Sequence, residues 1–258
     1  MKKTLIALAV AASAAVSGSA MAWTQQDSSY NGNIELGGVL QPETKKLPWE
    51  LQVGTGSNQL NGVITKGATK ATIKLTDAIP VLGMRTVNGG FSGAEGLTPQ
   101  IDYKGAINVD SFASGVTKMN LSVTDEAGNR IGSLSTDFST GAFGANNTHR
   151  SSLYAGKAGA AFWGGIGKTA AQVVNTVAAL ESVATSLFPT ILDTRGDMGN
   201  LVNTHPGEYY FTAPNHKYRS IYYSGIVAGK TISISLDTPA DTDNITWKAS
   251  LPVTVSYQ

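Results

Sequence analysis

Few residues in this chain combine the types and spacing that catalysis or metal binding requires. Gly167-Lys168-Thr169 matches the end of a phosphate-binding loop, but that motif needs a glycine six positions before the lysine, where this chain has Phe162. His149, His205 and His216 are separated by long intervals and form no metal-spaced pair. The chain has no serine in a G-x-S-x-G setting and no cysteine. The sequence therefore predicts no catalytic residue, no metal site and no cofactor.

Aromatic side chains, which can bind sugars, gather in the second half of the chain. An exposed ring stacks on the apolar face of a sugar, and neighbouring polar groups can fix the hydroxyls. The alternative is that these rings fill a hydrophobic core, which is the interpretation we favour for Phe162, Tyr222 and Tyr223. The full set is Tyr154, Phe162, Trp163, Tyr209, Tyr210, Phe211, Tyr218, Tyr222 and Tyr223.

The elements that must position these rings are mostly short β-strands. Apolar and polar residues alternate with a period of two, which is typical of half-buried strands. Asp125-Glu126-Ala127-Gly128-Asn129 separates two such segments and has the residues of a tight hairpin turn. This pattern predicts a mainly β, antiparallel sandwich. The clearest alternating segments are Trp49–Val53, Ala71–Thr76, Met119–Val123 and Ile232–Leu236.

One region departs from the strand pattern. Lys168–Leu187 is rich in alanine, lacks glycine and proline, and places apolar residues three and four positions apart. It predicts an amphipathic helix of about 20 residues that ends before Pro189. A second short helix is predicted over Thr190–Asn203. We therefore expect a helix-containing insertion, from about 140 to 217, carried on the β framework.

The first 22 residues have the pattern of a secretory signal peptide. Lys2 and Lys3 precede an apolar run that is too short to span a bilayer, and Ala20 and Ala22 fit a cleavage site before Trp23. Loss of the two lysines changes the formal net charge from +1 to −1. We expect an exported protein and no nucleic-acid partner.

The C-terminal segment has the most regular alternation in the chain. Its apolar residues predict a strand with one wholly buried face, and Pro252 suggests an edge or a bulge because proline cannot donate to a ladder. The strand could be an ordinary last strand of the sandwich. Alternatively, its terminal carboxylate could be gripped by basic side chains of a chaperone. The apolar positions are Trp247, Ala249, Leu251, Val253, Val255 and Tyr257.

A second alternating segment lies near the N-terminus. The Pro-containing segment Val39–Pro48 is the best candidate for a hinge that separates this N-terminal arm from the domain. A strand of about ten residues reaches some 33 Å, which is enough to run along a sandwich groove. It could equally be a first strand folded into its own domain. Its face consists of Tyr30, Gly32, Ile34, Leu36, Gly38 and Leu40.

These two ends, together with several internal segments, resemble the chaperone-usher pilins, and within them the FaeG-like major subunits of enterobacterial adhesive fimbriae. The resemblance covers almost the whole chain, and the two ends are its most specific part. Besides the closing segment from Trp247 to Tyr257, it is carried by the start MKKTLIALA, Tyr30-Asn31-Gly32 through Leu36-Gly37-Gly38, Trp49-Glu50 with Val53-Gly54-Thr55-Gly56, Phe162-Trp163-Gly164-Gly165 and Gly225 through Ile232.

The resemblance implies an immunoglobulin-like sandwich that lacks its last strand and exposes a hydrophobic groove. A periplasmic chaperone would lend a strand, and in the fibre the N-terminal arm of the next subunit would replace it. The implied parts are a donor arm at residues 23–40 and a pilin domain at residues 41–258. The implied partners are the chaperone, an outer-membrane usher and identical or related pilin subunits, and the implied location is a fimbrium at the cell surface.

The resemblance also implies roles for particular residues. Leu251, Val253, Val255 and Tyr257 would form the chaperone-binding strand. In FaeG-like adhesins the glycan site lies in the inserted helical region, near an aromatic residue that aligns with Tyr154.

Some relatives carry arginine five positions after that aromatic, where this chain has Gly159, with Lys157 nearby. This difference argues against an identical sugar specificity. Tyr154 and Lys157 are therefore the candidate residues for binding host-cell glycoconjugates. The competing hypothesis is a purely structural or minor subunit without a receptor site, and no feature supports an exported enzyme.

Overall fold

A large antiparallel sheet organises the computed structural model, which describes residues 37–38, 46–199 and 201–258. Every helix and strand among them lies in the compact unit of residues 45–258. Neighbouring strands along the main path of the sheet are antiparallel throughout. The path runs through β1 (Trp49–Val53), β3 (Ile79–Thr86), β10 (Lys217–Ile226), β7 (Arg130–Ala145), β11 (Thr231–Leu236) and β2 (Lys70–Lys74).

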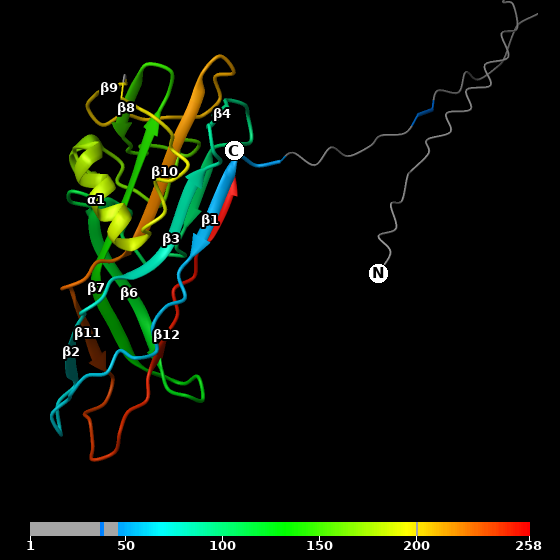
Figure 1. The fold of residues 1–258 in the computed structure, drawn as a ribbon. Helices are drawn as coiled ribbons and strands as arrows, with labels where there is room; N and C mark the ends of the chain where they lie inside the picture. Colours follow the sequence, from blue (N-terminus) through cyan, green and yellow to red (C-terminus); the bar gives the residue numbers. More distant parts are fainter. Residues whose placement is uncertain (1–36, 39–45, 200) are drawn as a thin grey trace, which may run out of the picture. The chain divides into compact units, whose positions relative to one another are not determined.

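The remaining strands complete a second layer and the upper end of the domain (Figure 1). β6 (Val116–Thr124) pairs with β7 and with β12 (Lys248–Ala249), while β13 (Thr254–Tyr257) pairs with β5 (Pro99–Asp102). β4 (Phe91–Ser92) pairs with β10. β8 (His149–Ser152) pairs with β7 and, in parallel, with β9 (Val202–Asn203).

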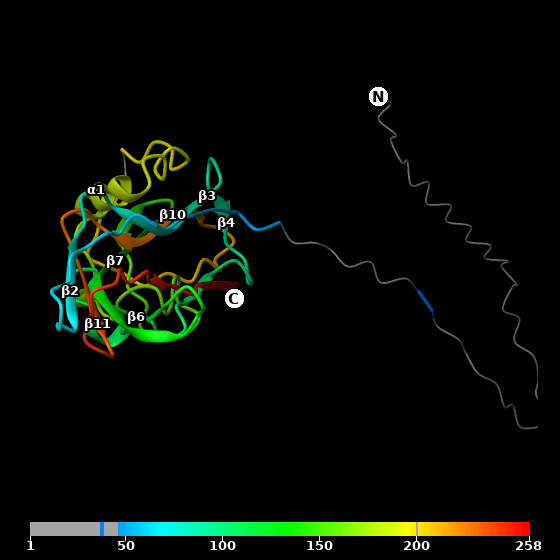
Figure 2. The same ribbon diagram turned by 90° about the horizontal axis from the view of Figure 1, so that it is seen from below.

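The main core fills the space between two β layers. Leu82, Met84 and Tyr222 enter it from β3 and β10, and Ile101 and Met119 enter it from β5 and β6. Figure 2, which looks along the strands, shows β3 and β10 in one layer and β6 in the other. The mainly β fold predicted from the sequence is therefore confirmed.

A second core lies on the outer face of the main sheet, under α1 (Val177–Leu187). Successive strand residues point to opposite faces, so Tyr222 lies in the main core while Tyr223 packs under the helix. The helix contributes Val177, Leu180, Ala184 and Leu187. The segment between β7 and β10, residues 146–216, carries this helix.

The predicted helix of about 20 residues is wrong in length. A 3₁₀ turn, η2 (Ala170–Gln172), is followed by extended Val173, and α1 begins only after Thr176, whose side chain accepts from the amide of Ala179 at 3.3 Å. The amide oxygen of Gln172 accepts from the backbone of Lys168 and Thr169, which favours a separate turn over a continuous helix.

The second predicted helix, over Thr190–Asn203, is also wrong. The backbone forms a series of turns instead, in which Asp193 bonds to Thr190 and Arg195 bonds to Leu192. Gly196 has a φ of 68°, which stops helical propagation. Residues 202–203 form β9. One further 3₁₀ turn, η1 (Val109–Ser111), lies between β5 and β6.

None of the helices among the described residues is long and apolar enough to cross a membrane.

Candidate functional site

The C-terminal strand is only partly covered by the rest of the domain. The predicted alternation is present, but the prediction of one wholly buried face is wrong, because the apolar side chains from Trp247 to Tyr257 are half-buried. They touch the main core from one side. Each half of the strand has one partner, β6 for β12 and β5 for β13. Among the described residues, no strand pairs with the other edge of either half.

β1 presents a second open edge. It pairs with β3 alone among the described strands. Trp49 is buried and donates its indole N–H to the carbonyl of Leu97 at 2.8 Å. Leu51 and Val53 follow on the same face at two-residue spacing, yet they are 47% and 63% exposed. The half-buried strand predicted here from sequence thus has the right bounds, but its apolar face is largely uncovered.

The two open edges lie on the same side of the sandwich, one in each layer. Figures 1 and 2 show β1 with the main sheet and the C-terminal strand with the opposite layer, both on the side where the chain ends. We call the region between them the open seam, and define it by Leu51 and Val53 of β1 and by Leu251 and Val253 of the C-terminal strand. Uncovered apolar side chains beside unpaired backbone edges are suited to receiving an additional strand.

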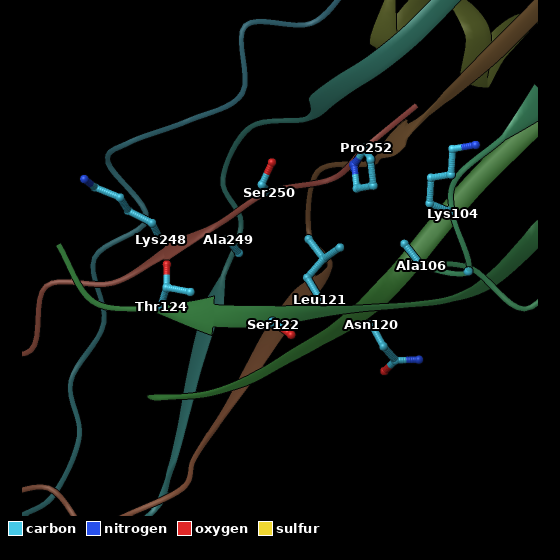
Figure 3. A pocket seen from close by; sticks show the side chains of 11 residues that line it. Lys104, Ala106, Asn120, Leu121, Ser122, Thr124, Lys248, Ala249, Ser250 and Pro252 are labelled. Atoms are coloured by element: carbon cyan, nitrogen blue, oxygen red, sulfur yellow. The ribbon is translucent and has the colours of Figure 1, made fainter. Parts of the chain in front are cut away.

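The C-terminal strand is also separated from β6 along part of its length. A cavity of about 730 Å³ lies where the segment leaves β6 and has not yet met β5, and Pro252 and Ser250 border it (Figure 3). Leu121 and Ala106 lie on its inner side, and Lys248 lies at one end. The interruption, residues 250–253, contains Pro252, which has no N–H to donate to a ladder. Between β12 and β13 the C-terminal strand therefore has no ladder to its own layer.

The predicted glycan-binding residues Tyr154 and Lys157 share one surface with two residues from a distant segment. The ammonium group of Lys157 lies 5.7 Å from the ring centroid of Tyr210. One carboxylate oxygen of Glu208 accepts from the amide of Gly156 at 2.6 Å, and the other accepts from the hydroxyl of Tyr210 at 2.6 Å. These contacts bring the loop after β8 against residues 208–210.

The charges on this surface favour the neutral, protonated form of the Tyr210 hydroxyl. Because Tyr210 donates to the carboxylate of Glu208, its pKa is raised to about 12, with smaller contributions from burial and from Tyr154. The surface therefore offers a half-buried ring at Tyr154, a cation at Lys157 and an acceptor carboxylate at Glu208. Rings beside polar groups can bind sugars. We call Tyr154, Lys157, Glu208 and Tyr210 the candidate receptor surface.

Other members of the aromatic cluster belong to the core, as the sequence suggested for three of them. Phe162, Tyr222 and Tyr223 are almost completely buried. The ring of Phe162 stacks on Tyr222 with centroids 5.2 Å apart and meets Trp49 edge to face at 5.7 Å. These rings hold the two layers together.

Most of the predicted donor residues lie outside the described part of the chain. Tyr30, Gly32, Ile34 and Leu36 are in this group. Gly38 is described, and it is exposed with no regular secondary structure. Among the described residues, no group of three or more histidine, aspartate or glutamate side chains could hold a metal ion.

Sequence reasoning missed residues whose role depends on distant partners. Glu208 and Gln100 carry no motif, and their contacts to residues 156–160 join segments at least 50 positions apart. Alternation along Trp49–Val53 was visible, but whether anything covers its apolar face was not.

The fold and the open seam define a class: a mainly β sandwich protein in which, among the described residues, β1 and the C-terminal strand leave edges uncovered on the same side. Comparison with known proteins identifies the family within that class. The family model described as "Fimbrial, major and minor subunit" matches residues 1–258. The chain is 32% identical to the K88 fimbrial protein AB of Escherichia coli, 31% identical to the K88 fimbrial protein AC and 30% identical to the F41 fimbrial protein, and each alignment covers 100% of both chains.

The chain therefore belongs to this family of fimbrial subunits. It is a fimbrial subunit of the K88 and F41 type that assembles with related subunits at the cell surface, and it is not an enzyme.

Proposed function

We propose that the subunit polymerises by donor-strand exchange, in which residues 23–40 of one copy fill the open seam of the next. The observation that carries this proposal is the exposure of Leu51 and Val53 opposite the half-buried face of the C-terminal strand. An added strand between these edges would satisfy backbone groups on both sides and cover both apolar faces. The alternating residues Ile34 and Leu36 supply a matching face.

Before assembly, the seam needs a temporary partner. We propose that a periplasmic chaperone pairs with the C-terminal strand along Leu251, Val253, Val255 and Tyr257, and that an outer-membrane usher directs the exchange. Support comes from the interruption in the pairing of this strand beside the cavity at Pro252. An uncovered apolar edge of this kind would otherwise promote aggregation.

Deletion of Trp23–Leu40 tests strand donation. The truncated subunit keeps its own seam, so we expect it to form chaperone complexes at wild-type levels but no polymers. The matched control is replacement of Thr24 and Gln25 by alanine, which leaves the alternating face intact and should leave polymers unchanged. Fibres of normal length from the truncated subunit would contradict strand donation.

We further propose that the subunit binds host-cell glycans through the candidate receptor surface. Support comes from the meeting of Tyr154, Lys157, Glu208 and Tyr210, which all lie in loops outside the strands of the sandwich. Binding residues are often carried by loops on a rigid scaffold. A glycan array probed with purified fibres tests this proposal. If the fibres bind no glycan, the subunit is purely structural.

A further inference from the structure

β5 lies between the open seam and the candidate receptor surface, because its two edges hold different segments. One edge pairs with β13, where Ile101 is opposite Val255. Just before β5, the backbones of Thr98 and Gln258 exchange hydrogen bonds of 2.9 and 3.0 Å. The other edge holds residues 160–163. The amide of Phe162 donates to the carbonyl of Pro99 at 2.7 Å, and the amide of Ile101 donates to the carbonyl of Trp163 at 2.8 Å.

Gln100 reinforces this second edge with its side chain. Only 7% of the residue is exposed. Its Oε1 accepts from the amide of Gly159 at 3.0 Å, and its Nε2 donates to the carbonyl of Ala160 at 2.9 Å. The same backbone turn is closed by the amide of Ala160, which donates to the carbonyl of Lys157 at 3.2 Å. Gln100 therefore fixes the turn that directly follows a residue of the candidate receptor surface.

We propose that Gln100 is a positioning residue for the receptor loop, residues 154–160, and that β5 makes the order of this loop depend on whether a second copy fills the open seam. The part of this proposal that concerns receptor binding rests on the proposed glycan binding. A strand paired on one edge opens locally more often than a strand paired on both. When β13 opens, β5 loses one of its two partners, and the loop loses part of its support. Completion of the seam would therefore favour the ordered loop, which is a coupling between assembly and binding.

The family of the chain and the chemistry of the open seam together indicate which partner fills the seam. The family assembles from fimbrial subunits, and the seam consists of strand edges, so a second copy of this chain is the partner that the observations favour. Coupling in this direction would give single subunits a poorly ordered receptor loop and fibres a well-ordered one.

Amide hydrogen exchange tests the coupling without any substitution. Fibres of the full chain are compared with subunits dissociated from the same fibres, and the reporters are the amides of Gly159 and Phe162. The control is the amide of Phe143, in the ladder between β7 and β10. We expect the protection of the two reporters in fibres to rise roughly tenfold more than that of the control, about the effect of one net hydrogen bond. An equal change at all three amides would overturn the coupling.

Gln100→Met tests the positioning role in assembled fibres. The substitution keeps the length of the side chain and removes its two hydrogen bonds to the receptor loop, together with the bond from Nε2 to the carbonyl of Pro99. We therefore expect exchange at Gly159 to speed up roughly tenfold while fibre number is unchanged. Attachment per fibre should fall in parallel. The matched control is Asp102→Asn on the same strand, whose side chain is exposed and bonds to Lys104. Unchanged protection at Gly159 would overturn the positioning role.

A folding defect would not leave the proposal undecided, because the wild-type exchange comparison is independent of the variant. Failure of the proposed glycan binding can also be distinguished from failure of the coupling. Fibres without any glycan affinity would remove the receptor function, while the exchange at Gly159 and Phe162 would still decide whether assembly orders the loop.

Discussion

The hydroxyl oxygens of Tyr103 and Tyr222 lie 2.8 Å apart in the main core, where they join the two β layers. Tyr103 also donates to the hydroxyl of Ser224 at 2.6 Å, and Tyr222 donates to the carbonyl of Gly165 at 3.2 Å. Both rings are almost fully buried. In a chain without cysteine, this network provides a polar link between layers that cannot be provided by a disulfide.

This network predicts a loss of stability at high pH. Burial raises the pKa of Tyr103 to about 12 and raises that of Tyr222 well above its ordinary value near 10. The folded state therefore retains protons that the unfolded state releases above pH 10. The contribution of these two tyrosines to the free energy of unfolding is fully present below pH 10. It falls between pH 10 and 12, by about 1.4 kcal/mol per pH unit for each group.

Guanidinium unfolding of the subunit from pH 8 to 11.5 measures this slope. The control is Tyr103→Phe, which removes one titrating group and should lower the slope by the share of that group. A free energy of unfolding that does not change above pH 10 would contradict this assignment of the buried tyrosines.

Gly164 predicts a sharp steric effect in the turn after Phe162. It has a φ of 81°, and a Cβ at this position would lie 2.1 Å from the carbonyl oxygen of Ile101. Gly105 has a φ of 79°, but nothing lies within 4 Å of the corresponding Cβ position. Gly164→Ala should therefore cost several kcal/mol more than the strain of about 1 kcal/mol expected for Gly105→Ala. Subunit levels and thermal midpoints measure the difference, and equal costs would argue against the close contact.

Tyr154 and Phe162 should respond differently to replacement by alanine. Tyr154→Ala should leave fibre number unchanged and reduce attachment, because its half-buried ring lies on the candidate receptor surface. Avidity along the fibre would amplify a small loss per site. Phe162→Ala should instead destabilise the subunit by about 3–5 kcal/mol, because it removes a buried ring.

A low-valency attachment assay, normalised to fibre number, separates the two effects. Lys157→Ala should resemble Tyr154→Ala. Wild-type attachment by both variants would move the receptor site elsewhere or remove it, and would favour a purely structural subunit.

Val255→Asp tests the role of the C-terminal strand in capture by the chaperone. The side chain is half-buried and lies opposite Ile101, so a carboxylate there would be forced against the core at a cost of several kcal/mol. We expect the variant to disappear from the periplasm, as measured by immunoblotting. Thr254→Asp, on the exposed face of the same strand, is the control. Normal amounts of the Val255 variant would indicate a self-contained last strand.

Local patterns predicted the strands better than they predicted what covers them. The bounds of Trp49–Val53 followed from alternation alone, but the exposure of its apolar face depends on the opposite layer, which the pattern does not describe. The length of the helix was overestimated because apolar spacing continued through Val173, while a side-chain contact from Gln172 favoured a separate turn.

The candidate site shows the same division. Tyr154 stood out as an aromatic residue that aligns with a residue of related adhesins. Glu208 and Gln100 did not, because their contacts to Gly156 and Gly159 form only after distant segments have folded together. Such contacts carry no periodicity and no motif.

The central claim, that a second copy fills the open seam, is tested most directly by engineered disulfides. The chain has no cysteine, so any disulfide between subunits can come only from introduced residues. Ile34→Cys or Leu36→Cys is combined with Leu51→Cys or Val53→Cys, and purified fibres are oxidised and run on a denaturing gel without reductant. The control replaces the β1 cysteine by Val63→Cys, which is 89% exposed on the loop after β1.

A disulfide requires Cα atoms within about 7 Å. Strand donation therefore predicts a ladder of covalent dimers, trimers and longer species for at least one seam pair, and only monomers for the control. Fibres of normal number that yield only monomers for every seam pair, or a ladder with the Val63→Cys control alone, would contradict the account.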